Sequence, residues 1–283
     1  MTASGRSLPW LRDKLRQGHP LPKDKWVEKV HGNGEIHSFH WRDQRFERRT
    51  LLALTDLTAR RSEKNSAMRI ALCLPSHRCG STACYYCKHL YWTKVRAKAA
   101  AASAGLRRCE MSFLTIIFGA AYLGIPQAEQ MIDDALPVLA RALRWKCGIK
   151  LIGRVELDYL LRGHTLKRDK RRTFATLGAP TEGDVPLLVP HLHALVFHSR
   201  IERRLLRLKL SRHFPGYKRV NLKCLHADKT IEENLDRLVR YPLKFLPPDH
   251  GQGTATSAEL RFGLRANEEL GGLHGKLHVE FGV

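Results

Sequence analysis

Two histidines separated by a single leucine make up the pattern in this chain with the clearest chemical meaning. They lie in segment 190–197, whose sequence PHLHALVF is typical of a buried strand. Side chains alternate between the two faces of a strand, so His191 and His193 are expected on one face and Leu192 on the other. Two neighbouring imidazoles can bind one divalent metal ion. The alternative is a pair of structural histidines that are hydrogen-bonded to their neighbours.

An acidic pair in the preceding predicted strand, residues 150–161, offers further metal ligands. Glu156 and Asp158 are two residues apart and therefore share a face of that strand. A hard divalent cation such as Mg²⁺ or Mn²⁺ favours an oxygen ligand beside the imidazoles. We predict Glu156 as the third ligand, with Asp158 as the alternative. Both carboxylates could instead be surface groups that face Lys or Arg side chains.

A tyrosine near the end of a predicted helix, residues 229–241, is a candidate nucleophile. A tyrosine phenol has a reference pKa near 10, so attack by Tyr241 on a phosphodiester depends on a nearby cation or metal ion. Lys244 lies three residues on, where it shares a helical face and would steady the phenolate or the phosphate. Pro242 disfavours helix at Tyr241, so this pairing depends on where the helix ends. The other interpretation is an ordinary aromatic residue at a helix end.

Four of the seven cysteines lie close together in the sequence, with five, four and two residues between them. Four thiolates suit tetrahedral Zn²⁺, and we predict a structural zinc site. Its ligands would be Cys73, Cys79, Cys84 and Cys87. His77 and His89 are substitute ligands, and a group of reduced structural thiols is the alternative.

The charge of the chain favours a polyanionic partner. Lys and Arg total 49 against 27 Asp and Glu, which gives a net charge of +22. Nucleic acid is the first expectation and an anionic membrane surface the second. Two basic clusters, 162–172 and 199–224, flank the histidine strand in the sequence. The predicted DNA contacts are Arg168, Lys170, Arg171, Arg172, Arg200, Arg203, Arg204 and Arg207.

The order of expected elements predicts an α+β fold with a central antiparallel sheet and packed helices. Strands are expected at 67–74, 111–118, 150–161, 187–197 and 217–225. Helices are expected at 50–64, 84–104, 126–145, 200–213 and 229–241. The predicted parts are a basic arm and helix (1–66), a Cys-rich module (67–108), a core that carries the histidine strand (109–247) and a C-terminal tail (248–283).

The N-terminal residues lack the apolar core of a signal peptide, and the longest apolar run is short. That run, 111–126, has 16 residues, fewer than a typical membrane span. A cytoplasmic protein is therefore expected, and in that compartment cysteines are more often thiols or metal ligands than disulfides.

Together these patterns resemble the HUH endonucleases, especially the one-tyrosine initiators of rolling-circle replication in bacterial plasmids and phages. Segment 190–196, PHLHALV, is similar to the metal-binding motif of that family. Segment 113–118, FLTIIF, resembles the strand motif that comes before it. Tyr241 and Lys244 fit the third motif, in which the tyrosine cuts DNA. The resemblance covers roughly residues 70–247.

The resemblance extends to two flanking features. The strand before the metal-binding motif often carries an acidic residue in that family, as Glu156 does here. A Cys-x-x-Cys pair often precedes the first motif, as Cys84 and Cys87 do here.

The resemblance implies an enzyme that nicks an origin hairpin and becomes linked to the 5′ end through Tyr241. The free 3′-hydroxyl would prime synthesis. Host helicase and polymerase are the expected partners, because the sequence has no G-x-x-x-x-G-K-[ST] loop for ATP. A transposase or relaxase with the same chemistry is one alternative. A non-catalytic, zinc-containing DNA-binding regulator is the other.

Overall fold

Contacts between residues divide the chain into two units. The computed structural model describes residues 26–30, 36–40, 50–54, 60–73, 78–145, 148–160, 167–180, 187–199, 201–240, 257–271 and 275–282. The first unit comprises Met1–Tyr91 and Asp249–Leu273, and the second comprises Trp92–Pro248 and His274–Val283. The fold is α+β, as predicted, with an antiparallel sheet and a cysteine cluster before it in the sequence.

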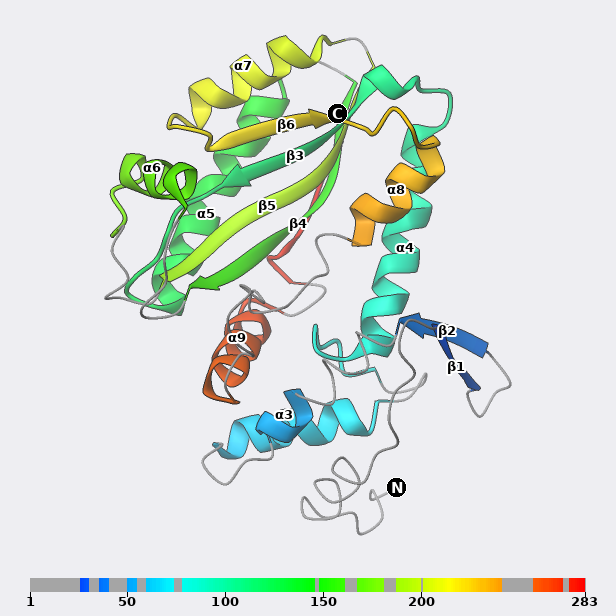
Figure 1. Cartoon of the computed structure of the whole chain (residues 1–283), viewed down its shortest axis with the longest axis vertical. Helices are drawn as coiled ribbons and strands as arrows, with labels where there is room; N and C mark the ends of the chain where they lie inside the picture. The colour runs from blue at the N-terminus through cyan, green and yellow to red at the C-terminus, as the bar shows by residue number, and fades with distance from the viewer. Residues whose placement is uncertain are drawn as a thin grey trace. The chain divides into compact units, whose positions relative to one another are not determined.

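A five-stranded sheet forms the centre of the second unit (Figure 1). Its strands are β3 (Met111–Ile117), β4 (Ile149–Leu160), β5 (Leu187–His198), β6 (Val220–Cys224) and β7 (His278–Gly282). The spatial order is β6-β3-β5-β4-β7, and every neighbouring pair is antiparallel. β7 lies in the segment predicted as a C-terminal tail, and it pairs with β4 as a strand of this sheet.

The helices of the second unit pack on this sheet and on one another. They are α5 (Ile125–Leu143), α6 (Arg168–Thr176), α7 (Arg203–His213) and α8 (Ile231–Arg240), with a short 3₁₀ turn at Arg108–Glu110. α5 contacts β5 and α7, and α7 also contacts β6. Leu192, in the middle of β5, is fully buried, as are Ile132 of α5 and Leu206 of α7. The apolar face of β5 thus anchors the strand that carries the two histidines.

The first unit is smaller and mainly helical. It contains the antiparallel pair β1 (Trp26–Val30) and β2 (Ile36–His40), α3 (Arg61–Ala71) and α9 (Ser257–Glu269). α4 (Tyr85–Ser103) contributes residues to both units. Arg69 of α3 forms an ion pair with Glu268 of α9 at 3.0 Å. Arg261 of α9 pairs with Glu63 of α3 at 3.7 Å, so two ion pairs connect these helices.

The predicted strand at 67–74 is wrong, because most of that segment belongs to α3. A short apolar run does not distinguish a strand from a buried helix segment. Ala67 and Ile70 are buried at helical spacing, and the Glu63 side chain accepts a hydrogen bond from the Arg60 amide at the start of the helix. α6, α9 and the β1–β2 pair were not predicted. Among the described helices, none combines the length and the apolar composition needed to cross a membrane.

Candidate metal centre

The register of the sheet brings the two histidines beside polar residues of both neighbouring strands. β4 places Glu156 directly opposite His191. His193 lies between Thr115 of β3 and Arg154 of β4. Residues that are directly opposite each other in antiparallel strands project from the same face of the sheet. These five polar side chains therefore share one face, with the histidines in the middle.

Glu156 and the two histidines form a group with the dimensions of a metal site. The Glu156 Oε2 atom is 3.4 Å from Nε2 of His191 and 3.7 Å from Nε2 of His193. One ligand atom from each residue lies within 4.8 Å of the others. Two ligands bound at about 2.1 Å to one ion lie about 3.0–3.5 Å apart. The group therefore fits one ion with small movements, whereas Asp158 lies opposite Val189 and outside this group.

Hydrogen bonds on the far side of each imidazole orient both rings. Nδ1 of His191 is 3.0 Å from the carbonyl oxygen of Val189, which only accepts, so this nitrogen carries the proton. Nδ1 of His193 is 2.9 Å from the hydroxyl oxygen of Thr115. A fixed partner on the second nitrogen is the usual arrangement of a metal-binding histidine. Both Nε2 atoms are thereby directed toward the Glu156 carboxylate.

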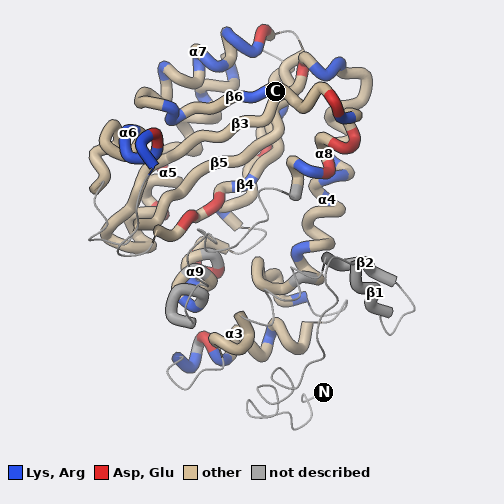
Figure 2. The backbone as a smooth tube through the Cα atoms, viewed as in Figure 1, with Lys and Arg blue, Asp and Glu red and all other residues tan. Residues whose placement is uncertain are grey.

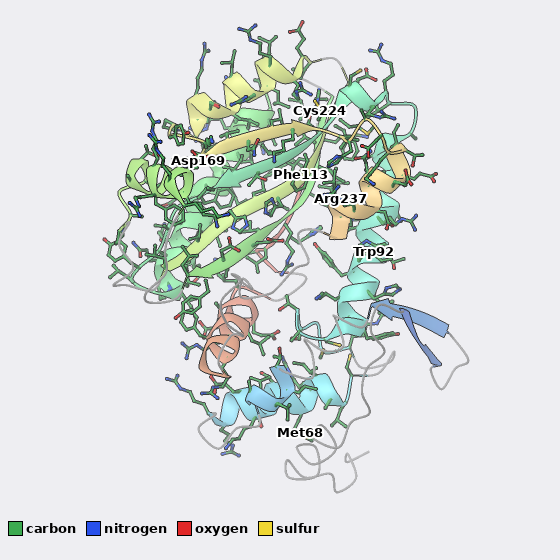
Figure 3. The ribbon with its side chains drawn as sticks, in the orientation of Figure 1. Met68, Trp92, Phe113, Asp169, Cys224 and Arg237 are labelled. Carbon is green, nitrogen blue, oxygen red and sulfur yellow. The ribbon has the colours of Figure 1, made fainter. Side chains whose placement is uncertain are left out.

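The site is buried, and one of its oxygen atoms lacks a partner. Only 6% of His191 and 6% of His193 are exposed, and Phe113, labelled in Figure 3, stacks on His193 with ring centroids 5.4 Å apart. Oε1 of Glu156 is buried and has no hydrogen-bond partner among the described residues. A buried carboxylate oxygen without a partner is unfavourable. A bound cation would remove this cost, so the donor set fits a divalent metal ion.

Arg154 adds a positive charge beside this group. Its side chain is buried on the same face, and it is two residues from Glu156 on β4. Burial raises the pKa of Glu156, and the hydrogen bond and charge of His191 and, to a smaller extent, the charge of Arg154 partly offset that rise. Sequence reasoning missed this residue and the orienting role of Thr115. Strand alternation was the available signal for Arg154, because it shares the face of Glu156.

Gly153 allows β4 to approach the histidine strand closely. A Cβ atom at this position would lie 2.5 Å from the backbone oxygen of His193 and 2.5 Å from Cβ of Ala194. Both distances are far below van der Waals contact, so any larger residue would push the two strands apart. The glycine therefore helps to set the spacing between Glu156 and the histidines.

Metal binding at this site is expected to strengthen as the pH rises toward 9. Burial lowers the pKa of His191, but the hydrogen bond to Glu156 and the charges of Asp158 and Glu156 outweigh it, and the pKa rises to about 9. Below that pH, an arriving ion must displace the proton on Nε2. The apparent affinity for Mn²⁺ should therefore rise about tenfold per pH unit between about pH 6 and 8. Titration calorimetry in buffers of different ionisation enthalpy measures the released proton, and a pH-independent affinity would contradict this expectation.

The proposed nucleophile lies just beyond a well-defined helix. Tyr241 and Lys244 are outside the described residues, and α8 ends at Arg240. α8 begins with reciprocal hydrogen bonds between Thr230 and Glu233, at 2.8 and 3.1 Å, which form a capping box. α8 also contacts β5, the strand that carries the histidines.

The four predicted zinc ligands come together in the first unit. The sulfur of Cys87 is 3.5 Å from that of Cys73 and 3.7 Å from that of Cys79. Cys84 directly precedes α4, and its sulfur accepts a hydrogen bond from the Cys87 amide. All four sulfur atoms lie within 4.8 Å of one another. Tetrahedral coordination at about 2.3 Å places sulfur atoms about 3.8 Å apart, so the group fits one metal ion.

One of the two histidines considered as substitute zinc ligands can be placed relative to this group. His77 is outside the described residues, and His89 of α4 is not part of the cluster. Contacts with the other three thiols lower the pKa of Cys73, which favours the thiolate form that binds metals.

Seven of the eight predicted DNA-binding residues lie on two helices of the second unit. Figure 2 shows Lys and Arg along both α6 and α7. The four on α6 and the three on α7 are all exposed, whereas Arg200 lies outside the described residues. These residues are Arg168, Lys170, Arg171, Arg172, Arg203, Arg204 and Arg207.

Comparison of the chain with protein-family models, with curated proteins and with solved structures found no match.

Proposed function

We propose that this protein is a metal-dependent DNA endonuclease that nicks one strand at a specific site, rejoins it, and so initiates rolling-circle replication. The observation that carries the proposal is the buried Glu156–His191–His193 group on two adjacent strands. Its composition suits a hard or borderline divalent ion. The basic surfaces of α6 and α7 support a polyanionic substrate.

In this proposal the side chains of the site hold the metal ion, orient its imidazole ligands and exclude water from them. Glu156 and the two Nε2 atoms hold Mg²⁺ or Mn²⁺, which when bound polarises the scissile phosphate. Thr115 and the Val189 carbonyl keep the imidazoles oriented, and their burial keeps water from the ligand atoms.

Tyr241 acts as the nucleophile. The phenol first loses its proton to solvent. The phenolate oxygen then forms a bond to phosphorus while the bond from phosphorus to the 3′ oxygen breaks, and that oxygen takes up a proton from solvent and leaves as the 3′-hydroxyl. Lys244 stabilises the phenolate or the phosphate. The phosphotyrosine link preserves the energy of the broken bond, so a later 3′-hydroxyl can reverse the reaction and rejoin the strand.

A covalent-adduct assay tests this function. The protein is mixed with single-stranded DNA that tiles its own replicon, with Mn²⁺ or Mg²⁺ and without added metal. We expect a denaturant-resistant protein–DNA band that depends on metal and maps to Tyr241 by mass spectrometry. The Tyr241→Phe variant should bind DNA and form no adduct.

Two results would oppose parts of this proposal. An adduct that persists in Tyr241→Phe would move the nucleophile to another residue. Salt-sensitive DNA binding without an adduct on any tile would favour a non-catalytic DNA-binding regulator, for which the cysteine cluster and the basic helices would be sufficient. For that cluster we propose structural Zn²⁺, because four thiolates in tetrahedral spacing are its typical ligands.

A further inference from the structure

A tyrosine and an arginine stack on each other at the surface of the second unit. The guanidinium carbon of Arg172, on α6, lies 4.3 Å from the centroid of the Tyr217 ring. The Tyr217 hydroxyl donates a hydrogen bond to Oδ1 of Asp169 at 3.1 Å. Nζ of Lys218 binds the other oxygen of the same carboxylate at 2.6 Å. Asp169, labelled in Figure 3, thus joins α6 to the segment that precedes β6.

The segment is held in a conformation that a lysine rarely adopts. Lys218 has a φ of 50°, in the left-handed region. Its ion pair with Asp169 holds it there, and a Cβ at Gly216 would lie 3.1 Å from the Thr176 hydroxyl at the end of α6. Phe174 anchors α6 in an apolar cluster with residues of β4 and β5. The backbone segment and the helix that carry the stacked pair are therefore held in place, which is typical of a binding site.

The same segment is tied to the strand beside the candidate metal centre. Arg219 donates from Nε to the carbonyl oxygen of Ile117 at 2.9 Å and from Nη2 to that of Phe118 at 2.8 Å. Ile117 is directly opposite His191 in the sheet. Only one residue, Lys218, separates Arg219 from Tyr217. A nucleic-acid strand bound at the candidate metal centre would need to extend only a short way to contact the stacked pair.

The charge around the stacked pair is strongly positive. Exposed cations surround it, and the single acid of α6, Asp169, is already paired with Lys218. Besides Arg172 itself, the cations are Arg168, Lys170, Arg171 and Lys218. Phosphates would be attracted here, while the aromatic ring and the guanidinium offer flat surfaces for a base.

We infer that Tyr217 and Arg172, with the surrounding cations, form a stacking subsite for an unpaired nucleotide of single-stranded nucleic acid. The inference rests on the proposed function, because the nucleotide would flank the phosphate held at the metal centre. A base within a duplex is already stacked on its neighbours and cannot insert, so the subsite selects unpaired nucleotides.

Binding of single-stranded DNA to ring-deleted and ring-retaining variants tests the subsite. Fluorescence anisotropy is measured without added Mg²⁺ or Mn²⁺, with labelled oligothymidine and oligodeoxyadenosine of about 20 nucleotides and with a duplex of the same length. Tyr217→Leu should weaken single-strand binding roughly tenfold or more and leave duplex binding unchanged. Its salt dependence should stay the same, because no charge is lost, whereas Arg172→Gln should reduce the slope by about 0.7.

Two further variants show whether a loss of DNA binding comes from lost stacking or from a folding defect. Tyr217→Phe keeps the ring and loses only the hydrogen bond to Asp169, so it should bind like the wild type. Tyr122→Leu removes another tyrosine, which is 45% exposed and outside the subsite, and should also bind like the wild type. In addition, oligothymidine with 5-iodouracil should cross-link to Tyr217 on irradiation, as shown by mass spectrometry.

The outcomes distinguish the subsite from the proposed function. Wild-type affinity in Tyr217→Leu, or an equal loss in Tyr217→Phe, would overturn the subsite even if the wild type cleaves DNA. The expected losses together with no adduct in the cleavage assay would support the subsite and oppose the endonuclease. Equal weakening of duplex binding by Tyr217→Leu would overturn selection for unpaired nucleotides.

Discussion

Replacing His193 by alanine is expected to reduce the proposed metal-dependent DNA cleavage by roughly 10³-fold or more. The substitution removes one of three ligands and leaves the Glu156 carboxylate with a single imidazole partner within the group. Glu156→Gln should have a similar effect, because it keeps the size of the side chain and removes its charge. Both variants should bind Mn²⁺ more weakly in calorimetry and bind DNA with nearly unchanged affinity.

His198 provides a matched control for this prediction. It is another buried histidine of β5, but strand alternation places it on the opposite face from His193. Its ring nitrogens bind the Ser112 hydroxyl at 2.9 Å and the Ile201 carbonyl at 2.8 Å. His198→Gln should therefore lower the stability and preserve Mn²⁺ affinity and cleavage per folded molecule. Normal Mn²⁺ affinity and cleavage in His193→Ala would return His191 and His193 to a structural role.

Loss of the Zn²⁺ that we propose for the cysteine cluster is expected to unfold the helical part of the first unit. A structural Zn²⁺ site contributes on the order of 10 kcal/mol of apparent binding free energy at neutral pH, and this becomes folding free energy. The Arg69–Glu268 ion pair between α3 and α9 is partly exposed and contributes at most about 1 kcal/mol. The Arg261–Glu63 pair is more buried, so the cost of removing its charges from water offsets much of its attraction. These ion pairs cannot replace the metal, so Cys87→Ser should lose the bound ion and melt the surrounding segment.

Metal analysis and hydrogen exchange check this second prediction. Cys87→Ser should contain less than one zinc per chain, and the amides of 61–71 and 85–91 should exchange rapidly. Cys109→Ser is the matched control, because Cys109 is exposed and outside the cluster. Full protection of both segments in metal-free Cys87→Ser would show that the cysteines are ordinary structural thiols.

The features of the candidate metal centre that depend only on strand alternation could be predicted from the sequence. The spacing of His191 and His193 placed both on one face, and β5 has that arrangement. The choice between Glu156 and Asp158 depends on how β4 is aligned with β5, which alternation leaves open. The observed register places Glu156 opposite His191 and settles which carboxylate joins the group.

The unpredicted features depend on contacts between distant parts of the chain. The bond from Thr115 to His193 requires the pairing of β3 with β5, and no local pattern specifies that pairing. α6 carries few apolar residues, and only Thr173 and Phe174 are buried, so its sequence lacks a helical period of apolar positions. β7 has only five residues, and its strand conformation depends on its pairing with β4.

The central position of β5 also affects how readily the site binds a metal ion. β5 is paired along its length with β4 and along much of it with β3, and all of its residues are buried. Amides in such a strand exchange with solvent only when the unit opens globally. The conformational entropy of ordering the two imidazoles is therefore lost once, during folding, and not at each binding event. A metal ion would meet ligands that are already in position, so little of its binding free energy would be lost to ordering them.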